Sequence, residues 1–499
     1  MAAQDATMYW LSARTRNDLF LLYCFTDTGR RTEDLRTFVA ERSARIADLR
    51  VRARVVPGDL DYPSWVQCDF AADQFVEHVL AEPDWAHLQA ALGEVLGTGV
   101  DAAVRPWRLH VFRGIVDAPG PNRAGPVLVA VLQMSHALAD GRRAADVARA
   151  LFAEADPGVE TGPKSVGGAT RTDRLLGART LATVVTRAAA AKVAGFGPCA
   201  TLRDSAVGVL RGPIGSATSA PVDAVLALPQ LPIRLARTAF RGYQAFRAQQ
   251  KLAELTEAGR LPSPGPDFPP SLVNQAATEA DWAHQVRMIV CDSAALRVPG
   301  RTVTVVVLTA VSLALTRYLD GRGGAVERLG AQVPMALSDT SIANARNNYR
   351  SLSVDLCIDE PDLRLRADKI ATTMADRRVR AQHPLLSAQD RVTAVVPAPL
   401  LRRDVDRYPL ATVPDSIAGH TVVSSVHRGP ANLMFGGGRV RFTGGFPAIG
   451  SVMRLTHGVH GLGETVTISL HADTATIPDL DSYAELLRVA LDETVQRLK

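Results

Sequence analysis

The sequence is poor in cysteine for its length. Its 499 residues contain five cysteines, and no two of them stand close enough in the chain to form a CxxC pair. The odd count and the wide spacing disfavour a disulfide framework and a zinc site. We therefore expect a protein of a reducing, cytoplasmic compartment that holds no metal.

The chain also lacks the runs that direct proteins to or across a membrane. The first residues, MAAQDATMYWLSARTRNDLF, contain no basic segment followed by an apolar one, so we expect no secretory signal. No run reaches the ~18 uncharged apolar residues that span a bilayer. The net charge of +5 is mild and no basic block is interleaved with aromatics. This balance does not imply a nucleic acid partner, and it permits contact with anionic lipid surfaces or phosphate groups.

Composition divides the chain into three parts, as the size prior of two or three domains suggests. Residues 1–155 and 271–499 mix helix and strand patterns, so both are expected to be α/β (α+β) domains. Residues 156–270 are rich in Gly, Ala, Pro and Arg. We expect this middle part to be an inter-domain connection that carries helices.

In the first domain the apolar patterns predict strands at 19–25, 107–115 and 127–134 and helices at 32–50 and 141–155. The run VLVAVLQM at 127–134 is continuously apolar and follows a Gly-Pro pair, which is typical of a fully buried strand. Thr32 and Glu33 suggest a cap at the start of the helix 32–50.

In the last domain the run at 301–319 predicts a buried helix, because it is too long for a strand. Strands are expected at 327–337, 349–358 and 464–473, and a terminal helix at 479–498. Asp479 or Asp481 is expected to cap the terminal helix.

A basic amphipathic helix is expected at 232–254 in the middle part. Three arginines fall on one face of it, Arg234, Arg237 and Arg241. An apolar stripe is offset from this face and consists of Ile233, Ala236, Phe240 and Tyr243. Such a helix can lie on a membrane or lipid-droplet surface. It can equally pack across the two domains with a solvated arginine face. Both alternatives stay open.

The motif SHALADG, Ser135 to Gly141, carries the clearest chemical signal. It stands between the buried strand and the following helix, a junction where α/β folds expose reactive side chains. An imidazole at His136 can take a proton from a hydroxyl held within ~3 Å. Asp140 can pair with an arginine or bond backbone N–H groups, and Gly141 allows a conformation or an approach that a Cβ would block. The alternative is a structural histidine whose ring nitrogens are both hydrogen-bonded within the protein.

An ordered series of segments surrounds this motif: LSARTRNDLFLL, YPSWV, VRPWRLHVFRGI, VLQMSHALADG, TVTVVVLTAVSLALTRYL, AQVPMAL, NNYRSLSVDL and ETVTISLHADTATIPDLDSYAELL. Over nearly its whole length the chain resembles the bacterial wax ester synthase/diacylglycerol acyltransferase family. That family lies within the superfamily of chloramphenicol acetyltransferase and peptide-synthetase condensation domains. SHALADG falls where the family has His-His-x-x-x-Asp-Gly.

The resemblance implies two chloramphenicol-acetyltransferase-like domains with a tunnel between them. It implies an enzyme that moves a fatty acyl group from acyl-CoA, its co-substrate, to a lipophilic alcohol such as a diacylglycerol or a long-chain alcohol. No other cofactor is implied. His136 corresponds to the family's catalytic base, and Asp140 and Gly141 to its architectural residues.

The chain departs from the family pattern at four places. Ser135 replaces the first motif histidine. The family's Asn-Asp pair appears as Thr304 and Val305, its Gly-Asn pair as Arg346 and Asn347, and its Thr-Asn pair as Ser424 and Ser425. These changes leave open a different substrate, or a catalytically inactive relative that binds lipid or a partner enzyme.

The developing charge on the thioester oxygen needs a hydrogen-bond donor. Asn347, Ser424 and Ser425 are the polar candidates for this oxyanion role, with turn capping as the alternative for each. His457 and His460 form an HxxH pattern, but the neighbouring glycines predict a loop there and no metal site.

Overall fold

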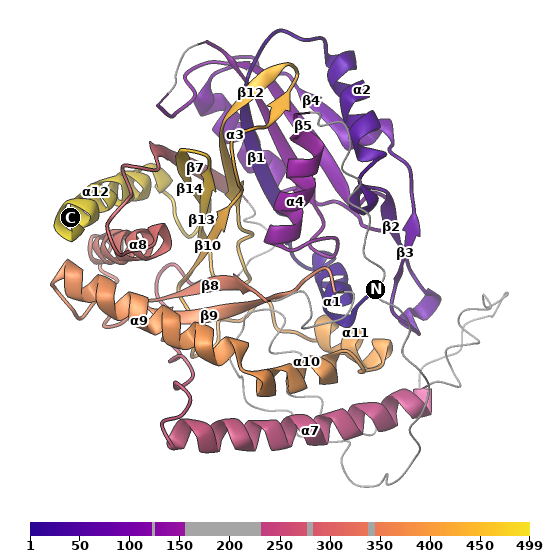
Figure 1. The fold of residues 1–499 in the computed structure, drawn as a ribbon, viewed down its shortest axis with the longest axis vertical. Coiled ribbons are helices and arrows are strands. Elements are labelled where there is room, and N and C mark those ends of the chain that lie inside the picture. Colours follow the sequence, from indigo (N-terminus) through magenta and orange to yellow (C-terminus); the bar gives the residue numbers. More distant parts are fainter. Residues whose placement is uncertain (122–124, 155–230, 277–282, 338–344) are drawn as a thin grey trace.

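The computed structural model describes residues 1–121, 125–154, 231–276, 283–337 and 345–499. Two six-stranded sheets flanked by helices form the body of the molecule (Figure 1). A third, two-stranded sheet joins β2 (Val51–Arg54) and β3 (Ser64–Gln67). The mixed α/β architecture agrees with the expected fold class.

The first sheet has the strand order β11-β12-β1-β6-β5-β4. Its strands are β1 (Leu19–Thr26), β4 (Phe75–His78), β5 (Trp107–Ile115), β6 (Val127–Met134), β11 (Met434–Phe435) and β12 (Gly438–Phe446). All eight residues of β6 are buried, as the continuous apolar run predicts. The helices α2 (Thr32–Ser43) and α4 (Gly141–Phe152) contribute to the core on one face, and α3 (Trp85–Leu96) to the core on the other.

The second sheet has the order β7-β14-β13-β10-β8-β9. Its strands are β7 (His284–Asp292), β8 (Gly330–Ala336), β9 (Tyr349–Asp355), β10 (Thr421–His427), β13 (Leu455–Leu462) and β14 (Thr465–Asp473). One core joins it to α8 (Val303–Asp320), α9 (Leu363–Gln382) and α12 (Leu480–Leu498). By length and composition α8 could cross a membrane, but most of its residues are buried in this core.

One hairpin of the second half belongs to the first sheet. β12 pairs antiparallel with β1, with Phe446 opposite Phe20, and it stands among the N-terminal strands in Figure 1. The chain then returns through β13 to the second sheet. The expected division at residues 155 and 271 therefore does not separate the two sheets, and this exchange fixes them against each other.

Most expected elements are present, with differences at their ends. The helix expected at 32–50 ends at Ser43, because the chain turns there to form the short strand β2. Its N-cap is Arg31, which makes no side-chain capping bond, so the cap expected from Thr32 and Glu33 is wrong. Asp479 caps α12 by accepting a hydrogen bond from the backbone N–H of Ser482.

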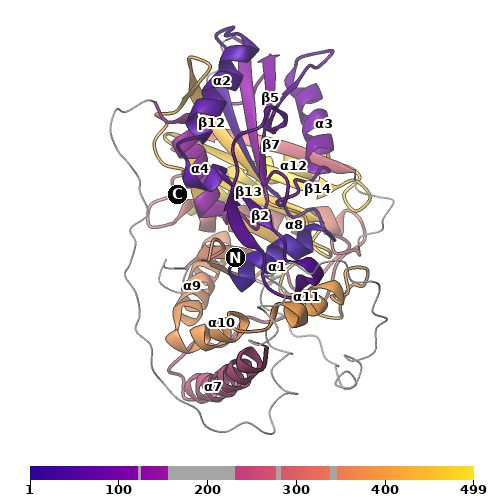
Figure 2. The same ribbon diagram turned by 90° about the vertical axis from the view of Figure 1, so that its right-hand side faces the viewer.

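The helix α7 (Leu231–Glu257) confirms the expected basic helix, although residues 155–230 before it lie outside the described part. It lies along the outside of α10 (Ser387–Thr393) in both views (Figures 1 and 2). Among its side chains described from residue 234 on, the buried ones are the small or apolar Thr238, Ala245, Ala248 and Leu252. The expected apolar stripe lies on the wrong face: Ala236, Phe240 and Tyr243 are exposed, and the side chain of Ile233 lies outside the described part.

Candidate active site

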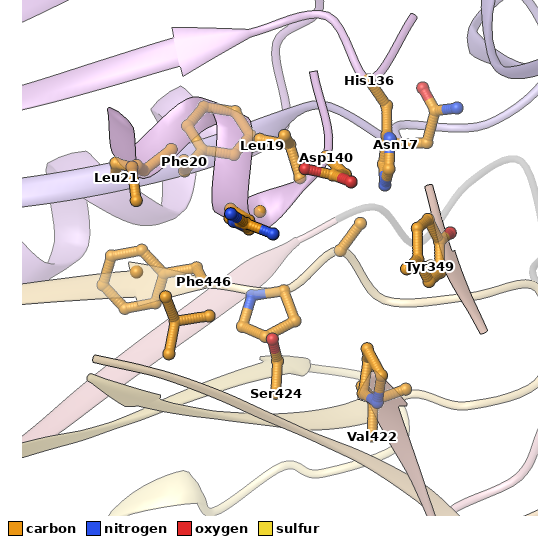
Figure 3. Close-up of a pocket in the computed structure, with 18 of the residues that line it drawn as sticks. Asn17, Leu19, Phe20, Leu21, His136, Asp140, Tyr349, Val422, Ser424 and Phe446 are labelled. Atoms are coloured by element: carbon orange, nitrogen blue, oxygen red, sulfur yellow. The ribbon is translucent and has the colours of Figure 1, made fainter. Parts of the chain in front are cut away.

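His136 stands directly after β6, where the chain turns toward α4. The turn is held by two backbone bonds: Ser135 N–H donates to the Pro106 carbonyl (2.8 Å) and Leu138 N–H to that of Ser135 (2.9 Å). Ser135 is fully buried, and its Oγ accepts a hydrogen bond from Ala137 N–H (3.3 Å). His136, in contrast, points into a cavity (Figure 3).

One ring nitrogen of His136 is held by Asn347. The distance from Nδ1 of His136 to Oδ1 of Asn347 is 2.7 Å. The Asn347 amide nitrogen donates to the His136 carbonyl (2.7 Å) and to Asp5 Oδ1 (3.0 Å), which fixes Oδ1 as the atom that faces the ring. Nδ1 therefore carries the proton and Nε2 the lone pair. Nε2 makes no hydrogen bond to any residue that the structure describes.

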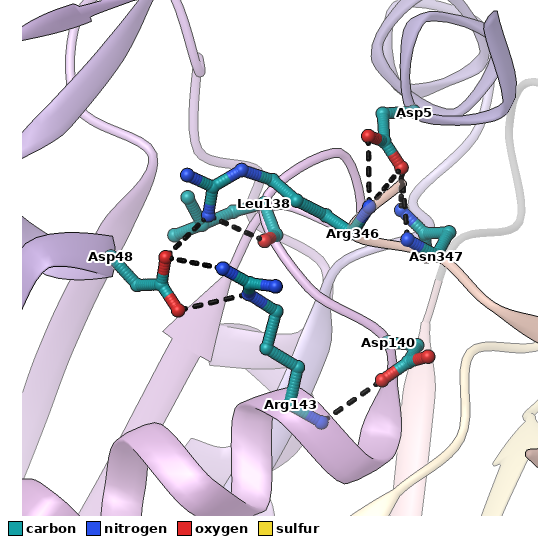
Figure 4. A network of polar contacts seen from close by, with 7 residues as sticks. All are labelled: Asp5, Asp48, Leu138, Asp140, Arg143, Arg346 and Asn347. Carbon is teal, nitrogen blue, oxygen red and sulfur yellow. Dashed lines mark hydrogen bonds and ion pairs between the residues drawn. The ribbon is translucent and has the colours of Figure 1, made fainter. Parts of the chain in front are cut away.

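Asp5 anchors Asn347 from α1 (Ala3–Ser12). Its carboxylate is fully buried and accepts hydrogen bonds from the backbone N–H groups of Arg346 (3.0 Å) and Asn347 (2.9 Å), beside the one from the Asn347 side chain (Figure 4). Burial raises the pKa of Asp5, and these N–H donors partly offset that effect. A carboxylate from the start of the chain thus orients the residue that orients His136.

Asp140 joins the two halves of the chain. It caps α4, where Oδ1 accepts from Arg143 N–H (2.9 Å), and Oδ2 accepts from Asn348 N–H (3.0 Å). The backbone role expected of Asp140 is confirmed. Gly141 differs from expectation: its φ is outside the left-handed region and an added Cβ would meet no protein atom within 4 Å. The turn itself does not require a glycine there.

A second carboxylate reinforces the same junction. Asp48 accepts hydrogen bonds from Nε (2.9 Å) and Nη2 (2.8 Å) of Arg143 and from Nη1 of Arg346 (2.7 Å), as Figure 4 shows. Burial alone would raise the pKa of Asp48, but the two guanidinium groups outweigh it and lower that pKa. The segment that carries Asn347 is therefore tied to the first sheet's domain by Asp5, Asp48 and Asp140.

The cavity below His136 has a volume of about 700 Å³. Apolar side chains from both sheets line much of it, among them Val426 and, as labelled in Figure 3, Leu19, Leu21, Val422 and Phe446. This size and lining are typical of small-molecule sites. An apolar chain can therefore be accommodated beside the imidazole.

Burial lowers the pKa of His136, and the hydrogen bond to Asn347 opposes part of the shift. The ring of Tyr349 lies 5.9 Å from that of His136, centroid to centroid, and burial raises the pKa of Tyr349 to about 12. At neutral pH the imidazole is therefore uncharged beside a neutral phenol, as a general base requires.

This shift predicts the acid limb of the pH–rate profile. Only the neutral imidazole can accept a proton, and a lowered pKa keeps it neutral as the pH falls. We expect kcat/KM to keep its plateau value as the pH falls to about 6.5, the usual pKa of histidine, and to decline only at more acidic pH. A profile measured with a neutral acceptor alcohol checks this; a midpoint above the usual value would contradict it.

The expected polar candidates have separate places. The side chain of Asn347 forms hydrogen bonds with the ring and the carbonyl of His136. Ser425 Oγ accepts a hydrogen bond from Thr304 Oγ (2.9 Å), while Val305 is buried. Ser424 lines the cavity, and its hydroxyl makes no hydrogen bond to the described residues. Ser425 lines the cavity as well, and of the two serines Ser424 is the one whose hydroxyl makes no hydrogen bond to a described residue.

His457 and His460 do not form a loop. Both lie in the strand β13, so the expectation of a loop is wrong: Gly458 between them and Gly461 after them allow close packing instead. An odd separation directs the two side chains to opposite faces of the sheet. The His457 ring contacts the hydroxyls of Tyr483 (2.8 Å) and Thr421 (2.9 Å), and only His460 lines the cavity.

Sequence comparison identifies the family. Residues 1–231 match the model of the wax ester synthase/diacylglycerol acyltransferase catalytic domain, and residues 346–494 match that of the WS/DGAT C-terminal domain. The chain belongs to the wax ester synthase/diacylglycerol acyltransferase family. The search of curated proteins gave no match to this family member.

Two solved structures resemble this family member in fold. The wax ester synthase/diacylglycerol acyltransferase from Marinobacter aquaeolei VT8 superposes with a TM-score of 0.55 at 16% identity, covering 99% of this chain and 98% of that one. A mutant starter condensation domain of rhizomide synthetase in complex with C8-CoA superposes with a TM-score of 0.51 at 12% identity, covering 99% and 94%. The architecture of two chloramphenicol-acetyltransferase-like domains is thus confirmed.

Proposed function

We propose that this protein is a CoA-dependent O-acyltransferase that moves a fatty acyl group from acyl-CoA to a lipophilic alcohol, with His136 as general base. The observation that carries the proposal is the imidazole itself: Nδ1 is held by Asn347, and Nε2 is unpaired among the described residues beside an apolar cavity. A diacylglycerol or a long-chain alcohol fits the apolar lining.

The proposed reaction needs no further cofactor. Nε2 of His136 takes the hydroxyl proton while the alcohol oxygen attacks the thioester carbonyl. The tetrahedral intermediate collapses with cleavage of the C–S bond, and the CoA thiolate receives the proton from the imidazolium. Asp5 and Asn347 keep the ring in the tautomer that this sequence of proton transfers requires.

Ser424 is proposed to stabilise the oxyanion of the intermediate, since its hydroxyl faces the cavity. We expect Ser424→Ala to lower kcat by about 100-fold, the lower end of the effect of removing one oxyanion donor. Ser425→Ala is the comparison, because Ser425 also lines the cavity but its hydroxyl is held by a hydrogen bond from Thr304. Steady-state kinetics of both variants test the role, and equal losses would count against it.

The exposed face of α7 is proposed to contact membranes or lipid droplets. Phe240, Tyr243 and Phe246 are exposed there, with Arg237 and Arg247 on the same helix. We expect the double variant Phe240→Ser/Phe246→Ser to bind anionic vesicles at least about 10-fold more weakly, because each aromatic ring contributes apolar area. Vesicle co-sedimentation measures this, with Leu365→Ser on α9 as the control. Unchanged vesicle binding would show that this face of α7 does not contact the membrane.

The proposed function is tested by CoA-thiol release from palmitoyl-CoA across a panel of alcohols, diacylglycerols and amines. Turnover that depends on one class of acceptor supports acyl transfer and names the acceptor. The alternative of an inactive lipid-binding relative predicts binding of palmitoyl-CoA without release by any member of the panel. No feature of the described residues, such as a second partner on His136, favours that alternative.

A further inference from the structure

A buried arginine lies on the wall of the same cavity. Arg428 follows the end of β10 and is only 7% exposed. One terminal nitrogen, Nη1, donates to Thr443 Oγ (2.5 Å) and to the Gly444 carbonyl (2.7 Å), both on β12. No carboxylate among the described residues lies within ion-pair distance of it. Its hydrogen-bonded partners are therefore neutral.

A buried guanidinium without a counter-ion is costly, because its charge has lost water and gained no opposite charge. Arg454 illustrates the usual solution: it is buried as deeply, and its Nε bonds Asp473 (2.9 Å). Burial lowers the pKa of Arg428, in line with the same missing partner. The cavity wall thus holds a positive charge that the described protein groups do not neutralise.

His460 lies beside Arg428 and is 5% exposed. Two glycines make the room for the pair: a Cβ on Gly445 would stand 2.6 Å from Nη2 of Arg428 and 3.0 Å from Cε1 of His460, and one on Gly458 would stand 2.6 Å from the same Cε1. Nε of Arg428 and Nδ1 of His460 have no hydrogen-bond partner. The ring centroid of Tyr23 lies 5.3 Å from Cζ of Arg428, so an aromatic face rather than a carboxylate lies against the guanidinium.

The cavity is also basic toward its exposed side. Arg142, Arg149 and His427 line it there, and Arg149 makes no ion pair within the described residues. Asp140 and Asp146 are the acids of the lining, and both oxygens of Asp140 are occupied by backbone N–H groups. Such an excess of positive charge in a low-dielectric cavity attracts anions.

We propose that Arg428 and His460 form a subsite for an anionic group, a phosphate or a carboxylate, of one of the two substrates. The proposal rests on the proposed acyl transfer and specifies its substrate class. Two sources carry this chemistry: the phosphates of the CoA donor, and an acceptor alcohol that bears a phosphate or carboxylate. A planar guanidinium binds either group through paired N–H donors.

The test uses the full-length protein with Arg428→Gln, Arg428→Lys and, as control, Arg364→Gln on the exposed start of α9. Each is assayed with palmitoyl-CoA and with the uncharged palmitoyl-N-acetylcysteamine thioester. Each donor is combined with hexadecanol and with ω-hydroxyhexadecanoate. We expect Arg428→Gln to raise KM by about 10- to 100-fold only for the substrate that carries the anion, with partial recovery in Arg428→Lys.

A KM effect confined to palmitoyl-CoA assigns the subsite to the donor, and one confined to ω-hydroxyhexadecanoate assigns it to the acceptor. An equal rise in KM with all four combinations, or no rise with any, would overturn the proposal. The role of Arg428 would then be limited to its hydrogen bonds with β12. Calorimetric titration with CoA and with inorganic phosphate separates this proposal from the acyl transfer. Arg428-dependent binding without any wild-type turnover would refute the proposed function and leave the anion site standing.

Discussion

His136→Ala is expected to lower the rate of acyl transfer by about 10²- to 10⁴-fold, the range that a positioned general base contributes. The His136 imidazole lines the cavity, and the hydrogen bond from Nδ1 to Asn347 leaves the lone pair on Nε2 free to accept a proton. Without it the alcohol must lose its proton to water. Single-turnover measurements of acyl transfer determine the ratio of rates directly.

The matched control for this variant is His87→Ala, since His87 is exposed on α3 and bonds Asp84 outside the cavity. Its rate is expected to match that of the wild-type protein. If the two alanine variants lost the same small amount of activity, His136 would be a structural histidine and the base would have to be sought elsewhere on the cavity wall.

Asn347→Leu is expected to lower kcat by about 100-fold or more while KM changes little. The leucine cannot accept the Nδ1 proton, so the ring can adopt the tautomer that places its proton on Nε2 and is useless as a base. An interaction that acts only on the reacting proton affects kcat rather than uniform binding of the substrate. Steady-state kinetics separate the two constants.

Stability must be measured alongside, because Asp5 loses one donor in this variant. We expect a cost of about 1–3 kcal/mol in the free energy of unfolding, which chemical denaturation detects. Asn432→Leu is the control, since that amide contacts Arg149 and not His136. A parallel loss of binding and turnover in Asn347→Leu would show that Asn347 holds the fold rather than the tautomer.

The sequence alone predicted the local features well. The unbroken apolar run 127–134 predicted β6, and the motif directly after it predicted that His136 stands at a strand-to-helix junction, where its side chain lines the cavity. Asp140 was expected at a helix start and is the N-cap of α4. These features depend on neighbouring residues, so the pattern of apolar and polar positions is enough to find them.

Contacts between distant residues were not predictable in this way. Asn347 was considered for the oxyanion role, but it holds His136, 211 positions away, and is itself held by Asp5, 342 positions away. An acid in an N-terminal helix gives no local signal of such a partner. Arg428 was missed for the same reason, since its burial results from the exchange of β12 between the sheets.

The faces of α7 and β13 show a second limit. Amphipathic spacing located α7, but small residues such as Ala245 and Ala248 pack against the protein while Phe240 is exposed. Packing depends on the shape of the opposing surface as well as on hydrophobicity. The glycines near His457 predicted a loop, whereas in β13 they let strands and side chains approach closely.

The most direct test of acyl transfer to an alcohol is to quantify free CoA and the acylated product in one reaction, with wild type and His136→Ala side by side. The account predicts one ester per CoA released with at least one lipophilic alcohol, and a rate at least about 100-fold lower for His136→Ala. CoA release without ester, equal rates for the two proteins, or palmitoyl-CoA binding without any release would contradict it.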